Sequence, residues 1–519
     1  MQVEPFLFSL QSVYRECIIL IMKTYTVFGN KIPESKARIG ERLFRHYAKK
    51  NGYDPAHPPV LTAVPSEKDF DDFGIMHVVE EGKAGLTSEG NFADPEAACT
   101  PVSRENSILL GTIRMGFGHC RMALAIASAA RYKGLTPYWL DMMSFPDNAA
   151  SKTIRQIEHW YNAGSRFSQN SRWFNDHIWE KLTSDAGRHL SGSLRDKTIS
   201  NIYAPLFKNV PEGMPFVSTH PWVGHGAVAA GVKGVVSIIP DNYPLAFHLV
   251  EGSYHAVQSP SCYMGYRTFI SMGEDNNLEY CLPKDYIYET GHYIDHEIVS
   301  NVEHDCDLRL KRLKDGKARR FLLTMGGAGA QAAKFADIIL TCRSVIDSHK
   351  ASFFINMGDH EGRWTALKAE FEKNGIQWTM HDDWNKTKEF IQSVENDDVK
   401  GIHVFLHKNF YAAVYATNLL MRISDVMITK PSELSFYPVP KLFIQRVGKH
   451  EAWGAIRGSE IGDGTIETGS VTSMHRTLKL LIEDTDLVEL YCEHIRKNKA
   501  AGIYNGAYNV IDVALKVQK

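Results

Sequence analysis

Two residues in the N-terminal half of the chain could carry acid–base chemistry, because each directly follows a short apolar run. His119 ends the glycine-rich turn MGFGH (115–119), which comes after the run SILLGTI (107–113). Asp241 follows the run GVVSIIP (234–240). A histidine can take a proton from a hydroxyl near neutral pH, and a carboxylate can orient that histidine or act as the base itself. We therefore predict a catalytic pair, with a helix-capping histidine and an Asx turn as the structural alternatives.

A glycine-rich loop in the C-terminal half is typical of an anion site. The sequence GGAG (326–329) follows the apolar run RRFLLTM (319–325). Backbone N–H groups in such a loop can cradle a diphosphate. There are two alternatives. One is a tight turn that needs small residues. The other is a dinucleotide loop, because Gly327, Gly329 and Ala332 fit G-x-G-x-x-A and Asp359 could be its ribose-binding acid.

A second loop in this half, ITKPSEL (428–434), supplies charged groups. Lys430 is expected near a phosphate and Glu433 on a ribose diol, whereas the structural alternative makes Ser432 a helix N-cap. The residues of this half expected to contact phosphate, ribose or sugar groups of a ligand are Gly326, Gly327, Gly329, Thr429, Lys430, Ser432, Glu433, His450 and Glu451. His450 and Glu451 are included because a polar pair after the last apolar run suits sugar hydroxyls.

The sequence contains no convincing set of metal ligands. The motif H-E-x-x-H would need a second histidine at position 454, which is Gly454, and His220 and His225 have no matching third ligand. None of the eight cysteines forms a C-x-x-C pair. We therefore expect neither a metal nor another bound cofactor.

Aromatic side chains are concentrated in residues 151–182, where Trp160 and Trp173 are two of several. Aromatic residues at such a density are usually part of a core. The alternative is an apolar platform for a lipid-like acceptor or for a membrane surface. The residues expected to hold an acceptor are Gly116, Gly118, Trp160, Trp173, His220 and His248.

The composition limits the class of protein. The chain has 519 residues, of which 44% are hydrophobic and 23% charged, as in ordinary globular proteins. With 58 Lys and Arg against 60 Asp and Glu, there is no overall positive field, and we expect no nucleic-acid partner. The start of the chain lacks the basic n-region of a signal peptide, and there is no run of 18 apolar residues. We expect a cytoplasmic protein, with peripheral membrane contact if the acceptor is a lipid.

The elements that must position these residues form two sets of buried strands alternating with helices. The runs of the first set are 107–113, 136–141, 214–220, 234–240 and 255–260, and those of the second are 319–325, 351–359, 401–407, 426–429 and 441–446. Continuous apolar runs of this length predict parallel strands, and the alternation predicts right-handed βαβ units. We therefore expect an α/β protein with two doubly wound domains. Ligands bind beyond the carboxyl ends of such strands, where the chemical loops lie.

The expected domain boundaries follow from these sets. Residues 1–105 are an N-terminal extension of unknown role, residues 106–300 a Rossmann-like acceptor domain, and residues 301–490 a Rossmann-like donor domain. Residues 491–519 form a C-terminal helix. Residues 34–50 read as an amphipathic helix, whereas residues 53–105 look dominated by loops.

Over roughly residues 106–490 these loops resemble the GT-B glycosyltransferases, in the branch of the diacylglycerol galactosyl- and glucosyltransferases and the peptidoglycan-precursor GlcNAc transferase. The matching elements, in the family's order, are MGFGH (115–119), Asp241 followed by His248, MGGAG (325–329), ITKP (428–431) and GKHE (448–451). The chain departs from the family in a shortened loop after Pro431, where Glu433 stands in for the family's later acid.

The resemblance implies transfer of a hexose from a nucleotide sugar, most simply a UDP-sugar, to an acceptor hydroxyl that a lipid could supply. It implies inversion at the anomeric carbon without a metal, with two domains facing a cleft. Three alternatives remain open at this point: a nucleotide-sugar epimerase of the same fold, an NAD-dependent oxidoreductase, and a catalytically degenerate binding protein.

Overall fold

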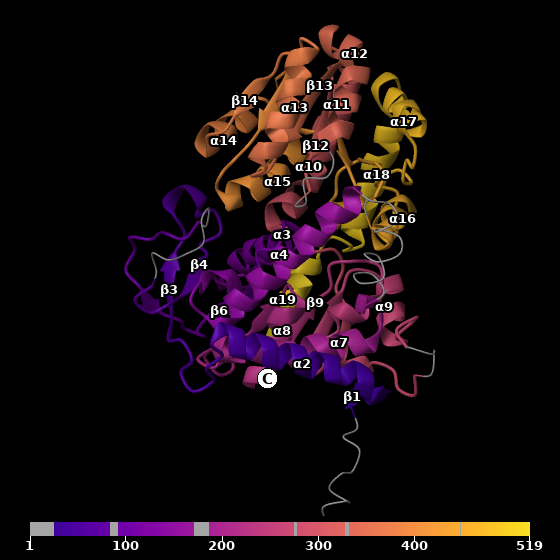
Figure 1. Cartoon of the computed structure of the whole chain (residues 1–519). Coiled ribbons are helices and arrows are strands. Elements are labelled where there is room, and N and C mark those ends of the chain that lie inside the picture. Colours follow the sequence, from indigo (N-terminus) through magenta and orange to yellow (C-terminus); the bar gives the residue numbers. More distant parts are fainter. Residues whose placement is uncertain are drawn as a thin grey trace, which may run out of the picture.

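A computed structural model describes residues 25–83, 92–170, 186–273, 278–326, 332–395, 397–446 and 448–518, apart from the side chains of residues 160–170 and 186. In this part of the chain two large β-sheets are each flanked by helices (Figure 1). One sheet comes from residues before 290 and the other from residues after 318. The expected class, an α/β protein with two doubly wound domains, is confirmed.

The first sheet has nine strands in the order β11-β10-β9-β8-β6-β7-β4-β3-β5. They are β3 (Leu61–Pro65), β4 (Met76–Glu80), β5 (Thr100–Pro101), β6 (Ser107–Thr112), β7 (Thr136–Asp141), β8 (Phe216–Ser218), β9 (Val235–Ile238), β10 (Tyr254–Val257) and β11 (Ile287–Glu289). All neighbours from β11 to β4 are parallel, and β3 is antiparallel to both β4 and β5. After β7 the chain crosses to β8 on the other side of β6. This reversal makes a topological switch point between β6 and β8.

Helices cover this sheet: α2 (Glu34–Asn51), α3 (Gly118–Tyr132), α4 (Ala149–Asn170), α6 (Ala186–Arg188), α7 (Leu190–Ile199), α8 (Pro221–Ala230) and α9 (Pro260–Arg267). Strand β6 is buried along its whole length, as expected for a parallel strand covered on both faces. Helix α8 packs so closely that a Cβ on Gly111 of β6 would lie 2.5 Å from Val223 Cγ1.

The N-terminal segment is integrated with the first domain. Helix α2, where the amphipathic pattern predicted a helix, packs on α7, and the short hairpin of β1 (Tyr25–Val27) and β2 (Asn30–Ile32) precedes it. The described residues of 53–105 are mostly turns and loops, as expected, but the sequence did not predict that β3, β4 and β5 within them extend the first sheet. Their short runs are surrounded by Pro, Asp and Gly, which hid the strand pattern.

The second sheet has six parallel strands in the order β14-β15-β13-β12-β16-β17. They are β12 (Arg319–Thr324), β13 (Ala351–Asn356), β14 (Thr379–His381), β15 (Gly401–Phe405), β16 (Val426–Thr429) and β17 (Lys441–Phe443). The chain builds outward from β12 on one side and then returns to β16 on the other. The switch point of this sheet therefore lies between β12 and β16.

Its helices are α10 (His296–Lys314), α11 (Ala332–Thr341), α12 (Arg343–Asp347), α13 (Glu361–Lys373), α14 (Trp384–Ser393), α15 (Phe410–Ile423), α16 (Ala452–Glu460), α17 (Val471–Glu483) and α18 (Asp486–Ala500). The last helix, α19 (Gly506–Lys516), leaves the second domain and packs against α3, β8 and β9 of the first (Figure 1). The expected C-terminal helical region thus belongs to both halves of the molecule.

A buried ion pair lies close to Tyr504, in the segment that leads into α19. Lys441 Nζ is 2.7 Å from Asp463 Oδ1, and both side chains are fully buried. Tyr504 donates its hydroxyl to Asp463 at 2.9 Å, and Lys441 donates to the Tyr437 carbonyl at 2.7 Å. Burial lowers the pKa of Lys441 and raises that of Asp463, while each charge offsets the other's shift. Burying either charge without the other would strongly destabilise the fold, so the two residues are tolerated in the core only together.

We expect Lys441→Met to lower the free energy of unfolding by about 3–5 kcal/mol, because it leaves the Asp463 charge buried alone. Urea unfolding would measure the loss. The double variant Lys441→Met/Asp463→Leu should recover much of it, since no unpaired charge remains. Breaking the exposed pair of Lys497 and Glu493 is the control and should cost less than about 1 kcal/mol. A single variant as stable as the native protein would contradict this account.

Candidate functional site

His119 lies at the switch point of the first sheet. The turn before it needs glycine at Gly116, whose φ is 75°, and α3 then begins at Gly118. His119 Nδ1 is 2.6 Å from the carbonyl oxygen of Thr219, which follows β8. A carbonyl oxygen can only accept, so Nδ1 carries the proton and Nε2 keeps its lone pair. His119 is thus in the tautomer that can take a proton from a hydroxyl at Nε2.

The surroundings keep this imidazole neutral. Burial lowers the pKa of His119, and the bond to Thr219 together with the charges of Asp241 and Glu433 offsets part of that effect. A neutral imidazole near pH 7 is the form that a general base requires. Asp241 and Glu433 come from different domains, so the electrostatic environment of His119 depends on both.

Asp241 follows β9 and faces His248. His248 Nε2 is 3.7 Å from Asp241 Oδ2. His248 Nδ1 lies 3.0 Å from the hydroxyl of Tyr266, which also accepts a hydrogen bond from the backbone N–H of Leu245 at 3.0 Å. Burial lowers the pKa of His248 to about 4, so this imidazole is neutral near pH 7.

His220 completes the histidine group. It caps α8, where its Nδ1 accepts from the N–H of Trp222 at 3.1 Å, and its ring lies 4.6 Å from that of His119. Phe247 packs on the other side of His220, with ring centroids 5.8 Å apart. The structure therefore brings His119, His220 and His248 together with Asp241. The side chain of Trp160 and the whole of Trp173 lie outside the described residues.

The second switch point holds Gly326 after β12 and Lys430 after β16. A Cβ on Gly326 would lie 3.1 Å from Lys430 Cε, so the loop needs glycine for the lysine to lie across it. The carbonyl of Gly326 accepts a hydrogen bond from His360 Nε2 at 3.1 Å. The other two glycines expected to bind a donor, Gly327 and Gly329, fall outside the described residues.

Lys430 is paired with Glu451. Lys430 Nζ donates to Glu451 Oε1, and Glu451 Oε2 accepts from the N–H of Gly448 at 3.1 Å. Burial favours the neutral amine, but the charges of Glu451 and Glu433 outweigh it and raise the pKa of Lys430. Lys430 is therefore positively charged, and its partner in this structure is the carboxylate of Glu451. His450 lies in the same turn, with its ring against Gly448.

Glu433 faces the first domain. A Cβ on Gly118 would lie 3.6 Å from Glu433 Cδ, so this carboxylate lies at the N-terminus of α3, where a negative charge is favourable. Ser432 occupies the N-cap position of the short helix Glu433–Phe436, as the structural alternative has it, but its side chain makes no capping bond. Thr429 is buried, and its hydroxyl accepts from that of Thr324 at 3.1 Å.

Further contacts join the loops of the two sheets. Phe117 packs on Gly358, whose φ is 64° and where a Cβ would lie 2.6 Å from the Phe117 ring. Asp359, which the dinucleotide alternative needs for a ribose, instead lies 3.7 Å from the guanidinium of Arg114. The rings of Tyr243 and Trp453 are 5.5 Å apart.

Sequence reasoning singled out none of Arg114, His360, Tyr266 and Trp453. Each follows or faces a strand end. A search of every residue just after a predicted strand, without regard to motifs, would have found Arg114 after the run 107–113 and His360 after the run 351–359. Tyr266 and Trp453 are placed by folding alone.

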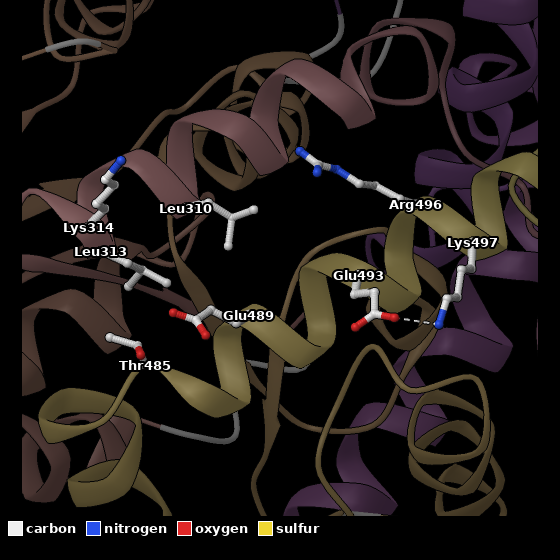
Figure 2. Close-up of a pocket in the computed structure, with 8 residues that line it drawn as sticks. All are labelled: Leu310, Leu313, Lys314, Thr485, Glu489, Glu493, Arg496 and Lys497. Atoms are coloured by element: carbon white, nitrogen blue, oxygen red, sulfur yellow. Dashed lines mark hydrogen bonds and ion pairs between the residues drawn. The ribbon is translucent and has the colours of Figure 1, made fainter.

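The described residues contain one further feature that could hold a ligand, a groove outside the candidate site. An open groove of about 760 Å³ lies between α10 and α18, lined by residues such as Leu310, Leu313 and Glu489, none of which belongs to the candidate site (Figure 2). Within the same described residues no cluster of three or more His, Cys, Asp or Glu is arranged to hold a metal. No helix in those residues is long and apolar enough to cross a membrane.

Comparison with known families divides the chain between residues 268 and 282, so that β11 of the first sheet falls within the second match. A model described as "Domain of unknown function (DUF6937)" matches residues 26–268, and one described as "Domain of unknown function (DUF6938)" matches residues 282–515. A search of curated proteins found no match.

Solved structures of similar shape exist at low sequence identity. UDP-GlcNAc 2-epimerase from Neisseria meningitidis is 12% identical, with 79% of this chain and 99% of that chain covered and a TM-score of 0.40. A putative UDP-N-acetylglucosamine 2-epimerase from Listeria monocytogenes is 10% identical, covering 78% and 94%, with a TM-score of 0.43. The α,α-trehalose 6-phosphate synthase from Burkholderia multivorans is 10% identical, covering 79% and 98%, with a TM-score of 0.42.

The depressed pKa of His248 has a consequence for stability. In the unfolded chain this imidazole takes up a proton near pH 6.5, whereas in the folded protein it does so only near pH 4. Protonation therefore favours unfolding as the pH falls. We expect the native protein to lose about 2 kcal/mol more stability than His248→Gln between pH 7.5 and 5, measured by urea unfolding. Equal losses in the two proteins would contradict the neutral, buried state of His248.

Proposed function

We propose that this protein is a hexosyltransferase that uses a nucleotide sugar, most simply a UDP-sugar, and an acceptor hydroxyl. The observation that carries the proposal is the proximity of the switch point of the first sheet to that of the second sheet. His119 stands at that of the first sheet, Lys430 at that of the second, and the charge of Glu433 acts on both residues. Doubly wound sheets bind ligands at these points, which here hold a candidate base and a buried cation.

In the proposed reaction the diphosphate of the donor lies on the Gly326 loop and Lys430. His119 Nε2 takes the proton of the acceptor hydroxyl, and the hydroxyl oxygen forms a bond to the anomeric carbon from the side opposite the diphosphate. The bond from that carbon to the diphosphate oxygen breaks, and its electron pair leaves with the diphosphate. Lys430 and backbone N–H groups stabilise the added negative charge. The sugar configuration is inverted, and no divalent metal is required in this scheme.

The remaining site residues fit supporting roles. Asp241, whose Oδ2 lies 3.7 Å from His248 Nε2, would stabilise the imidazolium that forms on His119 or bind the acceptor hydroxyl. Glu433 would hold the ribose diol, and His450 would contact sugar hydroxyls. Glu451 would change partner, since the diphosphate competes with it for Lys430. Gly116, Gly118 and His220 would shape the acceptor side.

A lipid hydroxyl is the acceptor class we propose to test first. Its support is the aromatic stretch of residues 151–182, most of whose side chains lie outside the described residues. An epimerase of the same fold differs in needing no acceptor. Release of free nucleotide that depends on an added acceptor would favour transfer, whereas conversion of the sugar without one would favour the epimerase.

Donor binding can be tested by calorimetric titration with UDP in the presence of EDTA. We expect saturable binding to the native protein and at least tenfold weaker binding to Lys430→Ala, because a charge-assisted contact to the diphosphate is lost. Lys368→Ala, an exposed lysine on α13, is the matched control and should bind like the native protein. Absence of UDP binding to the native protein would overturn the proposed function.

The base can be tested separately from binding. We expect His119→Gln to lower turnover by about 10²–10⁴-fold while leaving UDP affinity within about twofold, since the imidazole acts on the acceptor hydroxyl. Asp241→Asn should reduce turnover by a smaller factor. Turnover of a UDP-sugar against an acceptor panel would measure both. A His119→Gln variant with native turnover would remove His119 from the mechanism.

A further inference from the structure

Arg121 is a buried cation that the proposed chemistry does not use. It lies in the second turn of α3, and only 3% of its side chain is exposed. In the sequence it attracts notice only because it breaks a dinucleotide fingerprint, which would need a small residue at this position. A buried arginine is costly unless its donors are satisfied, so its partners indicate what it does.

One side of the guanidinium is fixed by a chain of polar groups from the second domain and the linker. Arg121 Nη1 donates to Asn418 Oδ1 on α15. Asn418 Nδ2 in turn donates to Asp295 Oδ2 at 2.9 Å. Asp295 is buried and caps α10, accepting from the N–H of Ile298 at 3.2 Å. Arg121 is therefore held in one orientation.

The other side of the guanidinium faces the candidate site. Arg121 Nε is 4.0 Å from Glu433 Oε1, and it has no hydrogen-bond partner among the described residues. The ring of Tyr437 lies 6.0 Å from the guanidinium carbon and covers it from the second domain. A buried guanidinium nitrogen, Arg121 Nε, thus lies at ion-pair distance from the carboxylate that is proposed to bind ribose.

We infer that Arg121 is a positioning residue, which sets the carboxylate of Glu433 for the hydroxyl pair of the donor's ribose. The inference rests on the proposed function. Arg121 belongs to the first domain and Glu433 to the second. Arg121 can therefore orient the carboxylate of Glu433 only while the two domains are in contact. Binding of a nucleotide to Glu433 is therefore coupled to the contact between the two domains. Nucleotide binding favours the contact, and the contact favours nucleotide binding to the same extent.

A double-mutant cycle tests this inference. Native protein, Arg121→Gln, Glu433→Gln and the double variant are titrated with UDP, which has a ribose, and with inorganic pyrophosphate, which has none. We expect each single variant to bind UDP about tenfold more weakly and the double variant to be no weaker than either one, because the arginine acts through the carboxylate. Pyrophosphate has no ribose, so none of the three variants should lose pyrophosphate affinity by as much as it loses UDP affinity.

The matched control is Arg422→Gln. Arg422 lies on the same helix as Asn418 and pairs with Glu297 at 2.7 Å and Asp305 at 3.4 Å, without a contact to Glu433. It should lower stability and leave UDP affinity unchanged. If Arg121→Gln does not fold, Arg121→Lys keeps the charge and loses the planar fork, and it should show the same selective loss of UDP affinity.

The outcomes separate the inference from the proposed function. UDP binding to the native protein, together with a hundredfold loss in the double variant, overturns the positioning role and leaves the proposed function standing. Equal loss of UDP and pyrophosphate affinity in Arg121→Gln also overturns it, since the effect would then be general. If the native protein binds pyrophosphate but not UDP, both the inference and the UDP-sugar function fail.

Discussion

The two backbone crossings between the domains are the constraint on which the candidate site depends. The outgoing and returning segments pair with each other: the N–H of His292 donates to the Ile503 carbonyl at 2.7 Å, and that of Gly506 to the His292 carbonyl at 2.9 Å. A Cβ on Gly506 would lie 2.2 Å from the Gly291 carbonyl oxygen, so only glycine permits this approach. Because α19 then packs on α3, the helix that begins beside His119 is tied to the end of the chain.

Burial and charge divide the site into two chemical halves. On the first domain, desolvation lowers the pKa values of His119, His220 and His248, so these imidazoles act as neutral donors and acceptors. On the second domain, carboxylates keep Lys430 charged despite its burial.

Much of the fold could be predicted from local pattern. All ten expected runs contain strands, from β6 to β10 and from β12 to β17 apart from β14, because buried parallel strands are continuously apolar. The missed strands are short or lie toward the sheet edges. Strand β14 has the sequence TMH and β11 the sequence IYE, and neither shows a period that distinguishes a strand from a loop.

The sequence by itself determined which residues follow the strands, and hence that His119, Asp241, Gly326, Lys430 and Glu433 would stand at the carboxyl ends of two sheets. Only the tertiary structure decided what they do to one another. The tautomer of His119 is set by a carbonyl 100 residues away, and Arg121 is held by Asn418, 297 residues away. Such contacts depend on which surfaces pack together, and local propensity and spacing carry no information about that packing.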